Sequence, residues 1–358
     1  RDKRQWEECI SHLAHLEYYK GSFEKSKKHY EDAMASAEQR GDKQIKNRCR
    51  AGIAAVLIAQ GDTAGALEIL MATNSYGQLA LCFLRDGKKE EALSRALLVK
   101  DRFKGVRTKY YVLKAFASTA EVIFQLLEDS QKKEEENAAI PNGRDSAVGG
   151  GRGSFTALSL STSLSSSLSA LSRPVSRLST LATLFWSTSS KAPAIQGQRS
   201  EVHLDDVNAL NAIAMEWVEK LEQFGNIYPV AKPRALLLRG RFLFLNRTGN
   251  GLNITGKTGL GLLRQSLATA KSLQMPYEEG LAHFELAKHA SSKPEATRHI
   301  NQALKCFNEV GAAYDATRCD DLLNAQRSQT VTNSGRSFSN IRRLLPGWRS
   351  PSPTPSSQ

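Results

Sequence analysis

Apolar residues recur three and four positions apart along most of the chain, a spacing that predicts amphipathic helices. The first run, expected to form the inner side of a helix that includes Trp6, consists of Cys9, Ile10, Leu13 and Leu16. After Gly21, a second run fits the inner face of another helix and consists of Phe23, Tyr30, Ala33, Met34 and Ala37. Gly21 ends the first helix, and Gly41 with Asp42 supplies the next stop and cap. The first forty residues therefore predict one helical hairpin.

A pattern of small residues repeats three times in one register. An alanine is followed by a glycine seven residues later and by a small residue after five more, in the triplets Ala14, Gly21, Ser26, then Ala54, Gly61, Ala66, then Ala80, Gly87, Ala92. Small residues let paired helices approach closely, and the glycine turns the chain between them. Helix pairs at 51–58 with 64–70 and at 79–84 with 90–98 are therefore expected to stack on the first hairpin.

Residues 201–325 repeat this organisation. One expected helix carries Ala209, Ile213, Trp217 and Leu221, and the next covers 236–245. Pro276 is placed at a helix start, Ala282 and Ala303 at helix contacts, and Gly311 at a turn. The sequence thus predicts an all-α solenoid of helical hairpins. The alternative is a compact antiparallel bundle, because small residues at helix contacts also occur there.

Two stretches lack this helical pattern. Residues 129–200 contain the run Gly149-Gly150-Gly151-Arg152-Gly153 and a tract rich in serine, threonine and leucine, which predicts a long disordered linker. Residues 326–358 end in alternating serine, threonine and proline, which cannot continue a helix and predicts a disordered tail. The expected organisation is helical repeats at 1–128 and 201–325, with the linker at 129–200 and the tail at 326–358.

The formal net charge of +13 is concentrated outside the expected helices. Residues 138–200 hold six Lys or Arg and one Asp, and residues 326–358 hold five Arg and no acid, so each contributes +5 and +3 remains. A basic helical face that reads phosphates is therefore not expected. No specific nucleic-acid partner is predicted.

The five cysteines never form a CxxC pair, which favours reduced thiols. They are Cys9, Cys49, Cys82, Cys306 and Cys319, and all but Cys49 lie among apolar helix positions. No apolar run approaches the roughly 18 residues that span a bilayer. The start at Arg1 carries neither an initiator methionine nor a signal-peptide core. We expect a cytoplasmic segment of a longer protein.

Residues 251–258 match the phosphate-loop pattern GxxxxGK[ST], with Gly251, Gly256, Lys257 and Thr258 at its fixed positions. In a working site a buried strand precedes such a loop. Here the preceding residues 235–245 have helical spacing, and no further strands follow. We expect a loop between two helices and no bound cofactor, with nucleotide binding as the alternative function.

No other pattern predicts chemistry. The histidines do not form an HExxH motif, since His283 and His289 are six residues apart and His12 and His15 lack an acidic third ligand. No set of nucleophile, base and orienting residue can be assembled from the sequence. Neither a metal site nor a catalytic residue is expected.

The linker contains a heptad-like run, Leu164, Leu168, Leu171, Val175, Leu178, Ala182 and Phe185. Pro174 and the many serines favour disorder, and the alternative is a segment that becomes helical on a partner or on a membrane surface through residues 155–186. Possible phosphorylation sites in the linker and tail are Ser176, Ser179, Ser350, Ser352 and Thr354.

The run from Leu273 to His289, with the later Val310-Gly311-Ala312 and Tyr314-Asp315, resembles the C-terminal helical repeats of large multidomain class III nucleotide cyclases of the soluble adenylate cyclase type and of related signalling ATPases. The units also resemble tetratricopeptide repeats, although the glycine spacing departs from that period. The resemblance implies a regulatory end of a cyclase-type protein and transfers no catalytic residue. The predicted function is a protein-interaction and regulatory module that binds other proteins or other domains of its parent chain.

Overall fold

The computed structural model describes residues 2–73, 75–102, 110–138, 202–246 and 259–332. These residues form thirteen α-helices and two short 3-10 helices and contain no strand. The predicted all-α class is confirmed. Residues 1–134 and 199–358 belong to one compact unit, and residues 135–198 to another.

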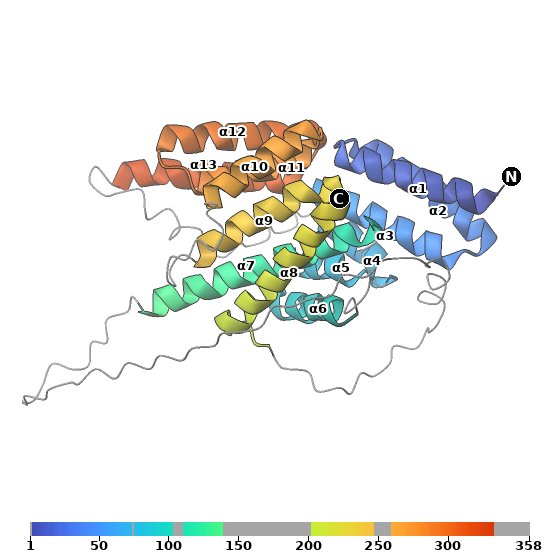
Figure 1. Ribbon diagram of the computed structural model, residues 1–358, viewed down its shortest axis with the longest axis horizontal. Coiled ribbons are helices and arrows are strands. Elements are labelled where there is room, and N and C mark those ends of the chain that lie inside the picture. Colours follow the sequence, from blue (N-terminus) through green and yellow to red (C-terminus); the bar gives the residue numbers. More distant parts are fainter. Residues whose placement is uncertain (1, 74, 103–109, 139–201, 247–258, 333–358) are drawn as a thin grey trace, which may run out of the picture. The chain divides into compact units, whose positions relative to one another are not determined.

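The N-terminal helices are arranged as consecutive hairpins (Figure 1). They are α1 (Lys3–Tyr19), α2 (Phe23–Arg40), α3 (Lys43–Gln60), α4 (Thr63–Met71), α5 (Tyr76–Arg85), α6 (Lys89–Arg102) and α7 (Leu113–Ala138), the last preceded by η1 (Tyr110–Val112). Aspartates begin several of them, because a carboxylate accepts hydrogen bonds from the free N–H groups of the first turn. Asp2, Asp42 and Asp62 do so in α1, α3 and α4.

The C-terminal helices continue the same arrangement. They are α8 (Val207–Ile227), η2 (Pro229–Ala231), α9 (Lys232–Leu245), α10 (Gly259–Ser272), α11 (Pro276–Lys288), α12 (Lys293–Val310) and α13 (Ala313–Thr332). Pro276 occupies the first position of α11, as expected from its fixed φ and missing N–H. The helix pairs predicted from the sequence in both regions are therefore present.

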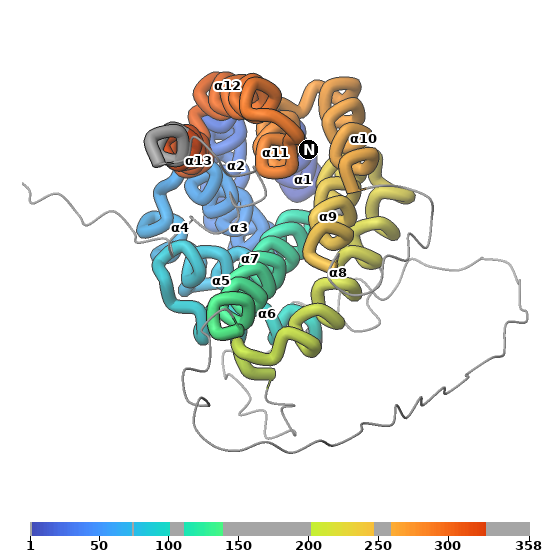
Figure 2. Tube along the Cα trace, turned by 90° about the vertical axis from the view of Figure 1, so that its left-hand side faces the viewer, coloured from blue at the N-terminus to red at the C-terminus, as the bar shows by residue number. Residues whose placement is uncertain are grey.

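Helix α7 lies in the middle of the unit, with helices from both regions around it (Figure 2). Its Phe116 ring packs edge-on against Trp217 and Phe224 of α8, with ring centroids 5.1 and 5.3 Å apart. On another side, a side chain at Gly77 of α5 would overlap the backbone of Ala115, so that glycine permits the close approach of α5. The two helical regions thus share one core around α7.

The predicted inner side of the first helix is wrong for Cys9, Leu13 and Leu16, whereas Ile10 is half-buried and packs against the core. Trp6, Leu13 and Leu16 of α1 are 48%, 38% and 54% exposed, and Cys9 is also exposed. The buried side carries Glu7, Ser11, Ala14 and His15 instead. Ala14 lets α2 approach, and the polar side chains find partners there, as when Ser36 donates to Glu7 over 2.8 Å. Polar pairing and small size outweigh apolar content on this helix.

Three further expectations differ from the structure. Cys49 is buried and Cys9 exposed, the reverse of the predicted order. Helix α7 extends to Ala138, past the expected boundary at 128, and its last six residues are exposed. Helix α13 extends to Thr332, past the expected boundary at 325. The remaining residues of the predicted linker and tail lie almost entirely outside the described residues.

Candidate functional site

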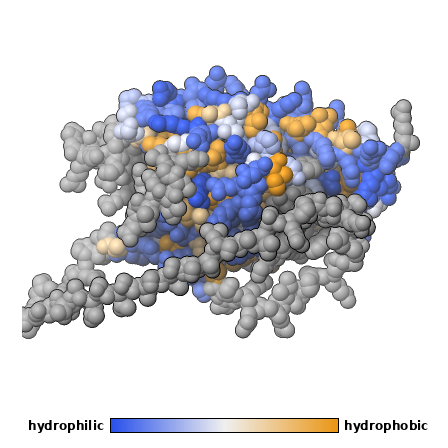
Figure 3. Space-filling model, in the orientation of Figure 1, coloured by the Kyte–Doolittle hydropathy of each residue, from blue (hydrophilic) through white to orange (hydrophobic). Residues whose placement is uncertain are grey.

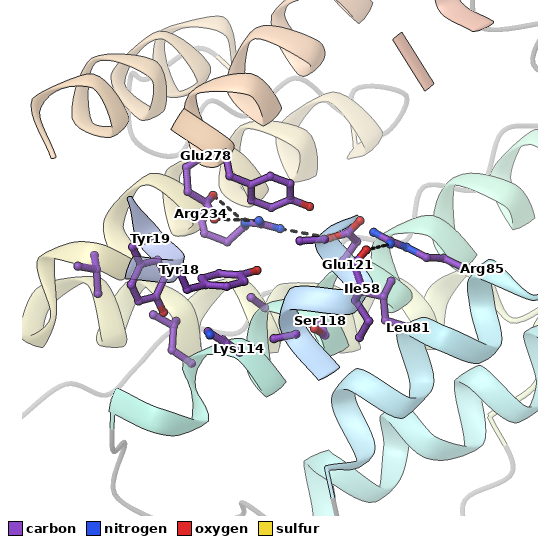
Figure 4. A pocket seen from close by; sticks show the side chains of 16 residues that line it. Tyr18, Tyr19, Ile58, Leu81, Arg85, Lys114, Ser118, Glu121, Arg234 and Glu278 are labelled. Carbon is purple, nitrogen blue, oxygen red and sulfur yellow. Dashed lines mark hydrogen bonds and ion pairs between the residues drawn. The ribbon is translucent and has the colours of Figure 1, made fainter. Parts of the chain in front are cut away.

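A cavity of about 50 Å³ lies where helices from both regions meet. Helix α7 forms one wall, and α1, α3, α5, η2, α9 and α11 supply the rest. Its polar and charged lining includes Tyr18, Arg85, Lys114, Glu121, Arg234 and Glu278 (Figure 4). The lining therefore depends on residues that are far apart in the sequence.

Lys114 of α7 is the unusual residue of this cavity, because it is a lysine with only 9% of its surface exposed. Its Nζ lies 3.6 Å from the centre of the Tyr18 ring and 5.3 Å from that of Tyr30. It donates a hydrogen bond to the Tyr30 hydroxyl over 3.3 Å. Burial lowers the pKa of Lys114 well below its ordinary value, since an ammonium loses its hydration there.

Tyr30 links Lys114 to a buried histidine. The Tyr30 hydroxyl and His15 Nδ1 are 2.6 Å apart, and His15 Nδ1 also lies 2.9 Å from the Ser11 carbonyl oxygen. Burial lowers the pKa of His15 well below its ordinary value, with the nearby Lys114 as a further cause. A Cβ at Gly52 of α3 would overlap the Tyr30 ring, so the glycine makes room for this tyrosine. The arrangement fixes the hydroxyl beside Lys114.

The opposite wall of the cavity carries a paired set of charges. Arg234 Nε and Nη2 donate to the two carboxylate oxygens of Glu278, each over 2.9 Å. Arg234 Nη1 lies 3.2 Å from Glu121 Oε2 (Figure 4). These contacts join α7, α9 and α11, and both acidic residues of the cavity wall share Arg234 as their ion-pair partner.

A second candidate site is the exposed apolar side of α1. We call the four residues Trp6, Cys9, Leu13 and Leu16 the α1 seam. They are separated by three, four and three residues, the spacing of contact positions in a pair of coiled helices. In Figure 3, hydrophobic residues lie among hydrophilic ones on the surface in the region of α1. The seam is therefore available to a partner helix.

The residues predicted to pack the repeats occupy helix contacts and turns. Ala14, Ala54, Ala80, Ala282 and Ala303 have no exposed surface. Gly21, Gly61, Gly87 and Gly311 follow α1, α3, α5 and α12, all with positive φ. None of these positions carries chemistry, and they belong to the scaffold.

The phosphate-loop residues Gly251, Gly256, Lys257 and Thr258 lie outside the described residues. The segment before them forms α9 and the segment after them forms α10. A helix thus stands where a phosphate-binding site requires a strand. The possible phosphorylation sites Ser176, Ser179, Ser350, Ser352 and Thr354 and the segment 155–186 also lie outside the described residues.

Three histidines of the C-terminal helices lie beside another ring. His283 Nδ1 and His299 Nδ1 are 2.8 Å apart, and His289 stacks on Phe244 with ring centroids 3.6 Å apart. Within the part of the chain that the structure describes, no group of three or more His, Cys, Asp or Glu is placed to hold a metal ion. No described helix is both long and apolar enough to cross a membrane.

Neither the cavity nor the exposure of the α1 seam was predicted from the sequence. Lys114 stands inside the apolar run Val112-Leu113-Lys114-Ala115-Phe116, and this was the one local signal for a buried lysine. Comparison of the chain with protein-family models, curated proteins and solved structures gave no match. The function is therefore inferred from the geometry of the cavity and of the α1 seam.

Proposed function

We propose that this chain is a protein-interaction module built from helical hairpins and that the α1 seam is its docking surface. The exposure of Trp6, Leu13 and Leu16 on one side of a single helix carries the proposal. Large apolar side chains at contact spacing on a surface helix are typical of interaction sites. The resemblance to the C-terminal repeats of multidomain cyclases supports a regulatory role within a larger signalling protein.

The partner that fits the seam is the α1 helix of a second copy, lying antiparallel. In that orientation Trp6 lies opposite Leu16 of the other copy, and Cys9 lies opposite its Leu13. In heptad terms, Trp6 and Leu13 occupy a positions, and Cys9 and Leu16 occupy d positions. Each pair therefore joins an a position to a d position, as antiparallel packing about a two-fold axis requires. The same register places the exposed Asp2 opposite the exposed Lys20, so the ends of the interface have opposite charges.

The proposed interface is small. A single pair of helices buries less than a stable dimer of standard size, and association has its own entropic cost. We therefore expect a dissociation constant of about 1–100 μM. Such an affinity produces a reversible dimer whose population depends on protein concentration.

Light scattering coupled to size-exclusion chromatography tests this proposal. We expect the chain to change from monomer to dimer as its concentration rises to about 300 μM, roughly three times the upper limit of the expected dissociation constant. Leu13→Glu places a charge in the seam and should raise the dissociation constant by about tenfold or more. Met71→Glu is the matched control, because Met71 is 64% exposed and lies on α4, outside the seam. A chain that stays monomeric, or equal effects of both variants, would contradict the proposal.

A further inference from the structure

The cavity beside Lys114 is lined by a buried amine that no carboxylate in the described part of the chain contacts. Three basic residues line it, Arg85, Lys114 and Arg234, together with two acidic ones, Glu121 and Glu278. Both acids pair with Arg234. Among the described residues, no carboxylate forms an ion pair with Lys114, whose polar partner is the Tyr30 hydroxyl. Arg85 is attracted by the nearby Asp315. Lys114 is thus a basic residue of the wall whose charge, in the protonated form, no described carboxylate offsets by contact.

A buried ammonium without an opposite charge is costly, and the surrounding rings compensate only part of that cost. The Tyr18 ring faces Nζ at 3.6 Å, a cation–π distance, with Tyr30 and Tyr19 farther away at 5.3 and 5.9 Å. Contacts of this kind contribute about 0.5–2 kcal/mol, less than the several kcal/mol that burying an ion costs. Burial alone therefore favours the neutral amine, in line with its lowered pKa, and an anion bound in the cavity would supply the opposite charge that favours the protonated form.

The size of the cavity limits what this anion can be. A cavity needs roughly 10–15 Å³ of such volume for each water, so 50 Å³ holds a few heavy atoms. A nucleotide or a peptide segment exceeds that space, whereas a carboxylate with one small substituent fits. Ser118 lies one turn after Lys114 on α7 and also lines the cavity, so its hydroxyl is placed on the same wall as the ammonium (Figure 4).

We propose that the cavity binds one small carboxylate of about the size of acetate, with the Lys114 ammonium as its counter-charge and the cavity wall as its size filter. This inference concerns a different part of the molecule from the α1 seam and does not depend on dimer formation. The ligand would join α1, α7 and α11, since all three helices line the cavity. Binding should therefore stabilise the folded chain.

Thermal unfolding in acetate tests the proposal at pH 7 and constant ionic strength, with gluconate as the balancing anion because it is too large for the cavity. For a dissociation constant of about 1 mM, 100 mM acetate should raise the melting temperature by roughly 3–6 °C. Acetamide has nearly the same shape and no charge, and it should give no rise. A direct measurement is the broadening of the ¹³C-acetate signal on addition of the protein.

Variants separate this site from a general salt effect. Lys114→Met removes the ammonium and should abolish the acetate response, whereas Lys20→Met removes an exposed lysine and should retain it. If Lys114→Met does not fold, Ala117→Leu fills the cavity while keeping Lys114 and should also abolish the response. Equal responses to acetate and acetamide, no response to acetate, or an unchanged response in a folded Lys114→Met or Ala117→Leu variant would overturn the proposal.

Discussion

Several charged side chains of this protein are buried and have partners on other helices. Arg234 is 9% exposed and bonds both oxygens of Glu278 while also contacting Glu121. The coulombic attraction and hydrogen bonds of Glu278 are the main causes that raise the pKa of Arg234 well above its ordinary value, against the opposing effect of burial. At the scale of the residue, specificity between α7, α9 and α11 comes from these paired charges.

Removing the arginine should be strongly destabilising. Arg234→Met leaves the buried carboxylate of Glu278 and the partly buried one of Glu121 without their partner, and we expect the free energy of unfolding to fall by about 3–5 kcal/mol. Arg239→Met is the control on the same helix. Arg239 has a 3.9 Å contact with the partly exposed Glu222 and a weak hydrogen bond to Met215 Sδ over 3.3 Å, so its loss should cost about 0–1 kcal/mol. Urea unfolding at pH 7 measures both values, and similar losses in the two variants would contradict this account.

Residue burial was the part of the structure least accessible from the sequence. The apolar run of the first helix predicted its buried side, but the buried side carries Glu7 and His15, because Ser36 and Tyr30 of α2 supply their partners. Lys114 was not predicted to be buried, since its environment depends on tyrosines about ninety positions away. Local patterns carry no information on such distant partners.

At the scale of the element, the turn after α1 differs from the turn after α2. Gly21 follows α1 and Gly41 follows α2, and their own φ angles are +77° and +75°. A Cβ at Gly41 would meet nothing within 4 Å, whereas a Cβ at Gly21 would overlap Val310 and would lie 2.9 Å from Pro276 Cγ. The first hairpin therefore packs directly on α11 and α12 from the other end of the sequence.

Alanine substitutions at Gly21 and Gly41 test the contact of the first hairpin with α11 and α12. An alanine in the left-handed region costs about 1–2 kcal/mol at either position. Gly21→Ala must also displace Val310 or Pro276, so its free energy of unfolding should fall by about 1–3 kcal/mol more than that of Gly41→Ala. Chemical denaturation of the two variants gives the difference directly, and equal losses would show that the first hairpin does not pack closely on the C-terminal helices.

The hairpins themselves could be predicted well. Helical spacing, the glycine stops and the capping aspartates are local signals, and they located the helix pairs of both regions. The contact between Gly21 and Val310 had no local signal, since it joins residues almost three hundred positions apart. The extension of α7 beyond residue 128 was missed because its last turns are rich in Lys and Glu and follow no apolar repeat.

At the scale of the whole unit, α7 holds the two helical regions in one core. Its aromatic contacts with α8 and its ion pairs with α9 place residues from both regions around a single helix (Figure 2). The question that the sequence left open, whether the regions pack together, is thereby answered. With the other helices engaged in this core, the α1 seam stands out as a surface run of large apolar side chains.

The most direct test of the docking surface uses Cys9, because the other four cysteines are buried. In the antiparallel register the two Cys9 residues of a dimer lie four positions apart along the helices, about 6 Å axially. A short bismaleimide added to the native chain at about 100 μM, the upper end of the expected dissociation range, should give a covalent dimer joined through Cys9, and Cys9→Ser should give none. Complete modification of Cys9 without a covalent dimer would contradict the docking surface proposed for this protein.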